Sequence, residues 1–392
     1  MAVPQWRSRP AFWNEELQMT RKTSRAWRET NLSALAHNAR TIQSALAPGC
    51  RLMAVLKADA YGHGALPVAR RLEAMSIKDF AVACLEEGIT LRRSGIRGRI
   101  LILGYTPPEL ASQLHRWKLT QTVADAAHGQ ALAACRLPLS VHLALDTGMH
   151  RLGISSEDHK ALRRLYELPG LHVEGVFSHL CVSDSLSPEN TAFTRLQLER
   201  FYEALRWLKE HHLAPGETHI QASYGIWNLP PQPCSLARAG IALYGVCSDD
   251  SPITRTLDLT PVLSLRARVT CVRTLASGEG AGYGLAFRAD QPRQLAVVAI
   301  GYADGLPRSL PQQGGEVLLH GMRCPMVGRM CMDQLLVDVT SLPGVTPGDA
   351  ATLIGTDGQQ QIHVEDIAQQ CGTITNEILS RLGARLPIVT TE

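Results

Sequence analysis

Lys57 stands where a short apolar run, residues 51–57, gives way to the polar segment K-A-D-A-Y-G-H-G. A lysine at the end of a buried strand is partly desolvated, which lowers its pKa and favours the neutral, nucleophilic amine. Such an amine can form a Schiff base with an aldehyde. A lone lysine at the rim of a domain is more often a solvated charge, so this interpretation needs support from other residues.

Further polar residues follow other apolar runs of the chain. Arg151 lies in D-T-G-M-H-R-L-G, His179 ends the segment F-S-H, Ser223 closes the run at 217–223, and Arg238 opens R-A-G-I-A-L-Y-G. Taken singly, each could belong to a salt bridge or be a satisfied core residue. Their recurrence at strand ends predicts that they converge on one site.

Eight apolar runs of β type alternate with helical patterns, as at 65–75 and 189–212, which is typical of a parallel sheet. Eight such units predict a closed (β/α)8 barrel, in which the carboxyl ends of the strands face the active site. An open doubly wound sheet is the alternative, but its glycine-rich dinucleotide fingerprint is missing. The expected strands are 51–57, 79–84, 99–105, 119–124, 139–146, 171–179, 217–223 and 237–245.

After residue 258 the pattern changes to β-type runs punctuated by turns, which predicts a mostly antiparallel β domain. We therefore expect an N-terminal tail at 1–24, the barrel at 25–258 and the β domain at 259–392. The first strand, 25–32, is expected to join the β domain.

The composition excludes several classes of protein. The 392 residues carry a net charge of +3, too balanced to indicate nucleic acid or an anionic membrane as partner. No apolar run reaches about 18 residues, and residues 1–24 lack the apolar core of a signal peptide. The ten cysteines include no C-x-x-C pair, which predicts reduced thiols in a cytoplasmic protein without a metal site.

An ordered set of motifs carries a resemblance to a known family. The set is A-V-L-K-A-D-A-Y-G-H-G, D-T-G-M-H-R-L-G, R-A-G-I-A-L-Y-G, G-Y-G, I-G-Y-A-D-G and V-G-R-M-C-M-D-Q. From residue 25 onward the chain resembles the alanine racemases. H-I-Q-A-S-Y-G-I-W-N and T-I-T-N-E also look like the racemase portion of the membrane-bound serine racemases of vancomycin-resistance clusters, without their membrane portion.

The resemblance implies pyridoxal 5'-phosphate (PLP) as cofactor and a homodimer with shared active sites. Lys57 would hold the cofactor and act as one catalytic base, and Tyr283 of the second subunit would be the other. Two bases on opposite faces suit racemisation, because one removes the α-proton and the other returns it. Arg238 would face the pyridine nitrogen and leave it unprotonated, and with His179 it would supply positive charge favouring the tyrosinate.

Other positions match binding residues of the family. Arg151 would contact the cofactor and the substrate carboxylate, to which Met332 of the partner would offer its backbone N–H, and Tyr302 would lie near the substrate entrance. The positions that match the phosphate-binding residues are Tyr61, Ser223, Gly240 and Ile241.

The chain departs from the family pattern at two positions. Many alanine racemases carry a carbamylated lysine where this chain has Ala144, so we expect another anion, chloride, beside Arg151. A family tyrosine is replaced by Asn376, which is smaller and offers both a donor and an acceptor to a substrate hydroxyl. The sequence therefore predicts racemisation of serine as well as alanine.

Two other functions share parts of this pattern. A PLP decarboxylase of basic amino acids has the same two-domain architecture, but that branch places a carboxylate where this chain has Arg238. A non-catalytic PLP carrier consists of the barrel alone and would not need the β domain with Tyr283. A racemase that supplies D-amino acids for peptidoglycan precursors agrees with all the motifs.

Overall fold

Eight parallel strands form the centre of the first half of the chain in the computed structural model, which describes residues 23–392. The strands are short and most of their residues are buried, because helices cover the outer face of the sheet and side chains fill the inner face. The strands are β2 (Arg51–Val55), β3 (Asp79–Val82), β4 (Arg99–Ile102), β5 (Thr120–Val123), β6 (Leu139–Asp146), β8 (Leu171–Phe177), β9 (Glu217–His219) and β10 (Leu236–Ala239).

The strands follow one another in the order β10-β2-β3-β4-β5-β6-β8-β9, and every neighbouring pair is parallel. A two-residue strand, β7 (Ile154–Ser155), adds to β6. The remaining seam, between β9 and β10, is bridged by single hydrogen bonds, from Thr218 N to Ser235 Oγ (3.1 Å) and from Arg238 N to Gln221 O (3.0 Å). The predicted (β/α)8 barrel is confirmed, with this seam as its loosest point.

Helices surround the barrel, and polar side chains begin several of them. Asn31, Asp125, Asp158 and Ser187 each accept a hydrogen bond from a backbone N–H in the first turn of the helix that follows. The helices are α1 (Leu32–Ser44), α3 (Ala65–Ala74), α4 (Leu85–Arg93), α5 (Ala111–Arg116), α6 (Ala126–Ala134), α7 (His159–Tyr166), α8 (Pro188–Glu210) and α9 (Ser223–Asn228).

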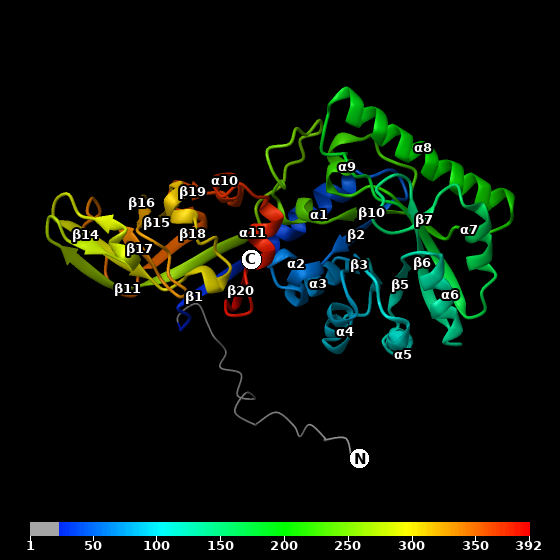
Figure 1. Ribbon diagram of the computed structural model, residues 1–392, viewed down its shortest axis with the longest axis horizontal. Coiled ribbons are helices and arrows are strands. Elements are labelled where there is room, and N and C mark those ends of the chain that lie inside the picture. The colour runs from blue at the N-terminus through cyan, green and yellow to red at the C-terminus, as the bar shows by residue number, and fades with distance from the viewer. Residues whose placement is uncertain (1–22) are drawn as a thin grey trace, which may run out of the picture.

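The second half of the chain folds into the predicted mostly antiparallel domain, which lies beside the barrel (Figure 1). Six of its strands close on themselves, because β18 pairs with both β15 and β11. Its main strands are β11 (Leu263–Leu275), β14 (Arg293–Val298), β15 (Glu316–Leu319), β16 (Met322–Val327), β17 (Leu335–Asp338), β18 (Ala350–Asp357) and β19 (Gln360–Ile362).

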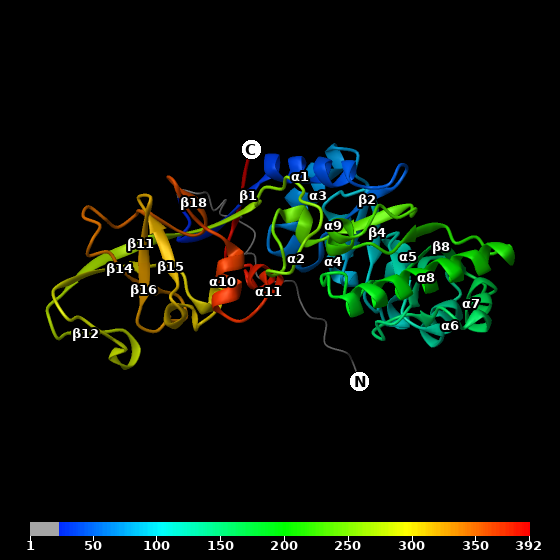
Figure 2. The same ribbon diagram turned by 90° about the horizontal axis from the view of Figure 1, so that it is seen from above.

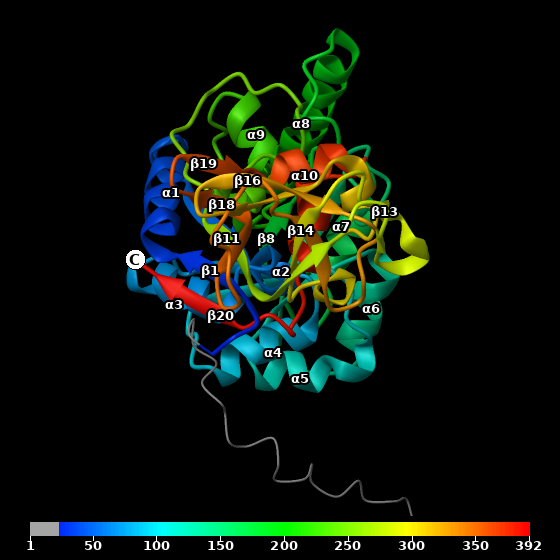
Figure 3. The same ribbon diagram turned by 90° about the vertical axis from the view of Figure 1, so that its left-hand side faces the viewer.

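The two ends of the described chain meet in this sheet. Strand β1 (Ala26–Asn31) pairs antiparallel with β11, and β20 (Ile388–Thr391) pairs parallel with β1. Helices α10 (Val364–Gln370) and α11 (Thr375–Arg381) lie between the β domain and the barrel, and the view along the long axis shows the sheet in front of the ring of barrel helices (Figure 3). The junction therefore contains both ends of the described chain together with α11.

Two further predictions concern the ends and the surroundings of the chain. The expected N-terminal tail, residues 1–24, lies outside the described residues as far as residue 22. Between residues 23 and 392, none of the helices combines the length and the apolar character needed to cross a membrane.

Candidate active site

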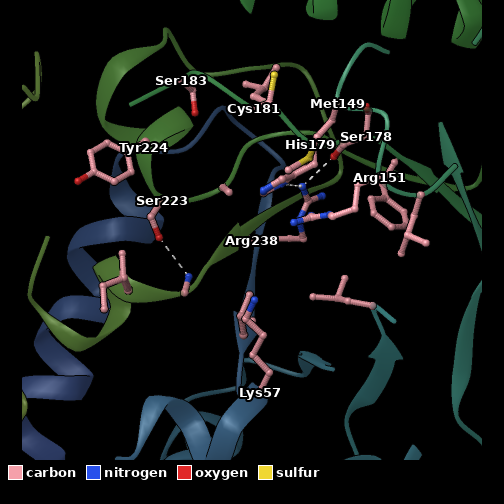
Figure 4. Close-up of a pocket in the computed structure, with 18 of the residues that line it drawn as sticks. Lys57, Met149, Arg151, Ser178, His179, Cys181, Ser183, Ser223, Tyr224 and Arg238 are labelled. Atoms are coloured by element: carbon pink, nitrogen blue, oxygen red, sulfur yellow. Dashed lines mark hydrogen bonds between the residues drawn. The ribbon is translucent and has the colours of Figure 1, made fainter. Parts of the chain in front are cut away.

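A cavity of about 510 Å³ opens at the carboxyl ends of the barrel strands (Figure 4). Its size is in the range of pockets that hold a small ligand together with a cofactor. Ala144 lies in its wall. Nine of the predicted site residues also line it: Lys57, Tyr61, Arg151, His179, Ser223, Arg238, Gly240, Ile241 and Asn376.

Lys57 is placed by an unusual turn. The expected strand stops at Val55, and the four residues that follow Lys57, 58–61, all have φ between 52° and 56°, in the left-handed region. This conformation costs about 1 kcal/mol or more for each L-residue, so neighbouring groups must hold it. Glu87 Oε1 accepts from Ala58 N (2.6 Å), and the turn, α2 (Lys57–Tyr61), directs Lys57 and Tyr61 into the same cavity.

The surroundings of Lys57 favour its neutral form. Burial lowers the pKa of the amine, and the nearby guanidinium groups of Arg151 and Arg238 lower it further, whereas Glu87 opposes them. Lys57 extends from the end of its strand towards these cations (Figure 4). The side chain is therefore suited to act as a nucleophile and as a proton acceptor.

Arg238 lies at the centre of a buried hydrogen-bond network. Its Nη1 donates to His219 Nδ1 (2.6 Å), and its Nη2 donates to His179 Nδ1 (3.1 Å) and to Ser178 O (2.8 Å). A guanidinium can only donate, so both histidine Nδ1 atoms must be unprotonated acceptors. Burial, and to a lesser degree the positive charge of Arg238, lower the pKa of His179 to about 3, which keeps this ring neutral.

The network continues into the barrel interior. With Nδ1 of His219 accepting from Arg238, the proton of this neutral ring is on Nε2, which donates to His142 Nδ1 (2.9 Å). Burial lowers the pKa of Arg238 to about 10, so the guanidinium is still charged at neutral pH. Arg238 is thus a fixed cation without a carboxylate partner, held by neutral acceptors.

Backbone and hydroxyl groups gather on the opposite side of the cavity. Ser223 Oγ accepts from Gly240 N and from Ala242 N, each at 3.2 Å. A Cβ atom at Gly240 would lie 2.6 Å from the hydroxyl of Tyr61, so only glycine lets this hydroxyl approach the chain. Burial raises the pKa of Tyr61, which therefore remains a neutral donor. Together with the N–H of Ile241, these groups form a cradle suited to an anion such as phosphate.

The outer wall of the cavity contains polar groups that lack partners. Within residues 23–392, Arg151 forms no hydrogen bond or ion pair, and Asn376 Oδ1 is buried without a hydrogen-bond donor. A buried polar atom without a partner, such as Asn376 Oδ1, is costly and is commonly found where a ligand binds, whereas the exposed guanidinium of Arg151 is accessible to solvent. This wall could therefore bind a ligand that has an anionic group for Arg151 and a hydrogen-bond donor for Asn376 Oδ1.

The structure does not bring the remaining three predicted residues to this cavity. Tyr283 is 66% exposed and Met332 is 53% exposed, and both lie on loops of the β domain, as does Tyr302. Backbone hydrogen bonds from Tyr302 N to Cys331 O (3.2 Å) and from Ala303 N to Met332 O (3.0 Å) join two of these loops. Strand β12 (Gly280–Ala281), just before Tyr283, lies at the end of the β domain away from the barrel (Figure 2).

Sequence reasoning missed part of the cavity wall. Tyr224, whose hydroxyl donates to Asp249 Oδ1 (3.0 Å), lines the cavity next to Ser223. The polar run C-V-S-D-S directly after His179 was the available signal for part of this wall. The other missed polar residues are Ser178, Cys181, Ser183, Asp184 and Ser248.

The donor set fits one kind of small molecule. A lysine whose pKa is lowered by burial could bind an aldehyde, and the cradle at Ser223 and Gly240 could bind a phosphate. Arg238 could face an unprotonated ring nitrogen. A phosphorylated aromatic aldehyde satisfies all three requirements within one cavity. The residues present therefore fit the predicted cofactor.

Relatives of known kind share this sequence over most of its length. The chain is 43% identical over 371 residues to an amino-acid racemase of Enterococcus faecalis and 40% identical over 370 residues to a serine/alanine racemase of Enterococcus gallinarum. Each match covers 94% of this chain and 52% of the relative. The chain thus spans about half the length of these curated relatives.

Solved structures and family models agree with these matches. The alanine racemase of Clostridium difficile in complex with cycloserine has a TM-score of 0.87 and 32% identity, with 94% of this chain and 96% of that chain covered. The model of the alanine racemase N-terminal domain matches residues 30–248, and that of the C-terminal domain matches residues 262–390. The chain therefore belongs to the alanine racemase family.

Proposed function

We propose that the protein is a PLP-dependent racemase that interconverts the L and D forms of alanine and of serine. One observation carries the proposal: the amine of Lys57 and the cradle formed by Tyr61, Ser223 and Gly240 line the same cavity. The names of the relatives support the activity, since one is an amino-acid racemase and another is a serine/alanine racemase.

Lys57 and Arg238 would divide the chemistry between them. When bound, the cofactor withdraws electrons from the substrate α-carbon and so acidifies its proton. Lys57 Nζ, whose pKa is lowered by burial, takes or returns this proton at one face. Arg238, which is charged at neutral pH, would face the ring nitrogen and leave it unprotonated, and this would limit the electron withdrawal and so suppress side reactions. A decarboxylase would need a carboxylate there.

The second base would come from another copy of the chain. Tyr283 lies in the exposed η4 (Tyr283–Leu285) of the β domain, outside the cavity of its own chain. A head-to-tail homodimer would insert it into the partner's site, opposite Lys57. The backbone N–H of Met332 and the side chain of Tyr302, on two loops of the same domain that hydrogen bonds join to each other, would come from the same copy as Tyr283. The charge of Arg238, relayed through the neutral ring of His179, would then favour the tyrosinate.

The outer wall would determine the substrate. Arg151, which has no partner in the described part of the chain, would bind the substrate carboxylate and the cofactor's phenolic oxygen. Asn376 Oδ1, buried and without a donor, would accept a hydrogen bond from the hydroxyl of serine. A site that hydrogen-bonds a substrate hydroxyl discriminates in favour of the substrate that carries one.

Three further assignments accompany the proposal. Chloride would take the place of a carbamylated lysine between Ala144 and Arg151. The barrel would comprise residues 25–258 and the β domain residues 259–392, with strand β1 of the first segment in the sheet of the second. The enzyme would act in the cytoplasm, and its D-amino acids would serve peptidoglycan precursors.

Purified protein loaded with PLP and incubated in parallel with L-alanine and L-serine tests the proposal, with the D-enantiomers followed by chiral chromatography. We expect both D-products. Formation of D-alanine alone would contradict the proposal that Asn376 allows serine as a substrate. No D-product from either would overturn the racemase proposal and bring back the decarboxylase, which release of carbon dioxide from lysine or ornithine would reveal.

A further inference from the structure

A buried cation lies behind the lysine turn and has no role in the proposed chemistry. Arg28, in the middle of β1, is 2% exposed. Among residues 23–392, its one carboxylate partner is Asp59, at 3.2 Å, and the side chain of Asp59 is about half exposed. A charge is costly to bury, and removing its partners is strongly destabilising, so a buried arginine with these surroundings calls for an explanation.

The guanidinium of Arg28 connects three separate segments of the chain. Its Nη1 donates to Gly62 O (2.7 Å) and Asp59 Oδ2 (3.2 Å) in or beside the lysine turn, and to Leu382 O (3.3 Å) just after α11. Its Nε and Nη2 donate to Leu386 O, at 3.2 and 3.0 Å. One side chain therefore holds the turn, the end of α11 and the segment before β20.

The turn and α11 are in close contact at this point. A Cβ atom at Gly62 would lie 2.3 Å from Leu379 O, so the turn is pressed against the helix backbone. The turn begins at Lys57 and ends at Tyr61, and α11 bears Asn376, which lines the same cavity. Any movement between turn and helix would change the distance between the amine and the Asn376 amide.

The turn also needs external support. Residues 58–61 are all left-handed and none is a glycine, so the turn is unfavourable by itself. Asp59 links its two supports, because Oδ2 accepts from Arg28 while Oδ1 accepts from Ala65 N (2.8 Å) at the start of α3. Without Arg28, three carbonyl oxygens and one carboxylate at the base of the turn would lose their donor.

We propose that Arg28 is a positioning residue that clamps the Lys57–Tyr61 turn to helix α11 and so sets the separation between Lys57 and Asn376. The inference rests on the proposed function, since Lys57 and Asn376 are taken as the cofactor-binding and serine-selecting residues. Arg28 itself touches neither cofactor nor substrate. It acts through the backbone of the turn and therefore affects cofactor retention and substrate choice together.

The experiment compares Arg28→Met with a matched control, Arg266→Met. Arg266 lies on β11, the strand paired with β1, and pairs with Glu29 at 3.1 Å, but contacts no part of the turn. Cofactor-free protein is titrated with PLP by visible absorption, and the ratio of D-serine to D-alanine formation is measured. We expect Arg28→Met to weaken PLP binding about tenfold or more and to change the ratio, and Arg266→Met to change neither.

Arg28→Lys keeps the charge but cannot reach all the acceptors, so its PLP affinity should lie between those of wild type and Arg28→Met. If Arg28→Met does not fold, Asp59→Asn tests the clamp instead. This variant removes the ionic contact with Arg28 and keeps an acceptor for Ala65 N. Asp59→Asn should then weaken PLP binding several-fold. PLP affinity and product ratio equal to those of Arg266→Met, in every variant that folds, would overturn the clamp.

Amide hydrogen exchange separates this inference from the proposed function. Exchange at residues 57–62 should be faster in Arg28→Met than in Arg266→Met, whether or not the protein is a racemase. Equal exchange in the two variants would refute the clamp. If wild-type protein binds no PLP while Arg28→Met still exchanges faster than Arg266→Met at residues 57–62, the proposed function is refuted and the clamp stands.

Discussion

The mouth of the barrel and the Tyr283 loop of the β domain each carry one of the two proposed bases, and they differ in how far they bury it. At the barrel mouth, Arg238 is buried and held by a hydrogen-bond network within one chain, and Lys57 lies half-buried in the same cavity. On the β domain, Tyr283 and Met332 are exposed and line no part of that cavity. Groups whose pKa must be shifted need burial, which the barrel provides by itself.

The difference shows how the site divides between copies of the chain. Within a single chain, burial and the neighbouring cations already lower the pKa of Lys57, while Arg238 stays charged at neutral pH. An exposed tyrosine gains a comparable environment only when another copy covers it. One chain should therefore bind the cofactor, whereas racemisation should require two.

The largest effect is expected from Lys57→Ala, which removes the amine of the barrel half. Racemisation should fall by about 10³-fold or more, because both cofactor attachment and one proton acceptor are lost. Turnover measured with excess PLP, beside the control Lys160→Ala on the exposed face of α7, checks this. Near-normal turnover of Lys57→Ala would show that the lysine at the barrel mouth does not take part in catalysis.

Tyr283→Phe tests the proposed second base, which lies on the β domain. Turnover should fall by about 10²- to 10⁴-fold while PLP binding persists, because the lost hydroxyl belongs to the partner's site. The decisive measurement mixes this variant with Lys57→Ala after dissociation and reassociation. Each heterodimer then contains one intact site, so about a quarter of wild-type activity should return. No recovery from a mixture shown to contain heterodimers would mean that the sites are not shared.

Acid should destabilise the barrel more than the β domain. Burial lowers the pKa of His142 to about 4 and that of His179 to about 3, below the usual 6.5. Above pH 6.5 these rings are neutral in both states. As the pH falls from 6.5 towards 4, only the unfolded chain takes up the protons, so stability declines by about 1.4 kcal/mol per pH unit for each ring.

The thermal midpoint measured from pH 8 to pH 4.5 checks this expectation. The exposed His212 offers the control, since His212→Gln should leave the profile unchanged. A midpoint that stays constant down to pH 4.5 would show that the histidines of the Arg238 network are not buried as neutral rings.

A smaller effect is expected at the outer wall. Asn376→Tyr should lower the ratio of D-serine to D-alanine formation by about tenfold, because it fills the space and removes the buried acceptor. Asn376→Leu, which is close in size to asparagine, separates these causes by removing only the acceptor. An unchanged ratio in both variants would show that Asn376 does not choose the substrate.

The smallest effect concerns Arg151. Replacing chloride by sulfate at constant ionic strength should raise the KM for alanine by about two- to fivefold, because an unpaired guanidinium orients the substrate less well. Ala144→Glu, which supplies a carboxylate near Arg151, should make the KM independent of chloride. A crystal grown without halide that shows an ordered Arg151 and no density beside it would contradict the chloride proposal.

Local patterns were sufficient to predict much of this molecule. Apolar runs of six to nine residues alternating with helical patterns predicted the barrel, and the motifs that carry the family resemblance, with the departure at Asn376, predicted nine residues of one cavity. Tyr224 and Ser248 were missed, because a polar residue next to a motif looks like any loop residue. Their place in the wall follows from the path of the chain after β9 and β10.

The sequence alone determined the residue types and their order along the chain, and with them the strands, the amine and the glycine at position 240. Only the tertiary structure decided that the strand ends at Val55, that residues 58–61 turn left-handed, and that Arg28 lies beneath them. The physical reason is distance along the chain. Arg28, Gly62 and Leu382 are brought together only by the sheet and α11, and no local pattern records contacts between such distant segments.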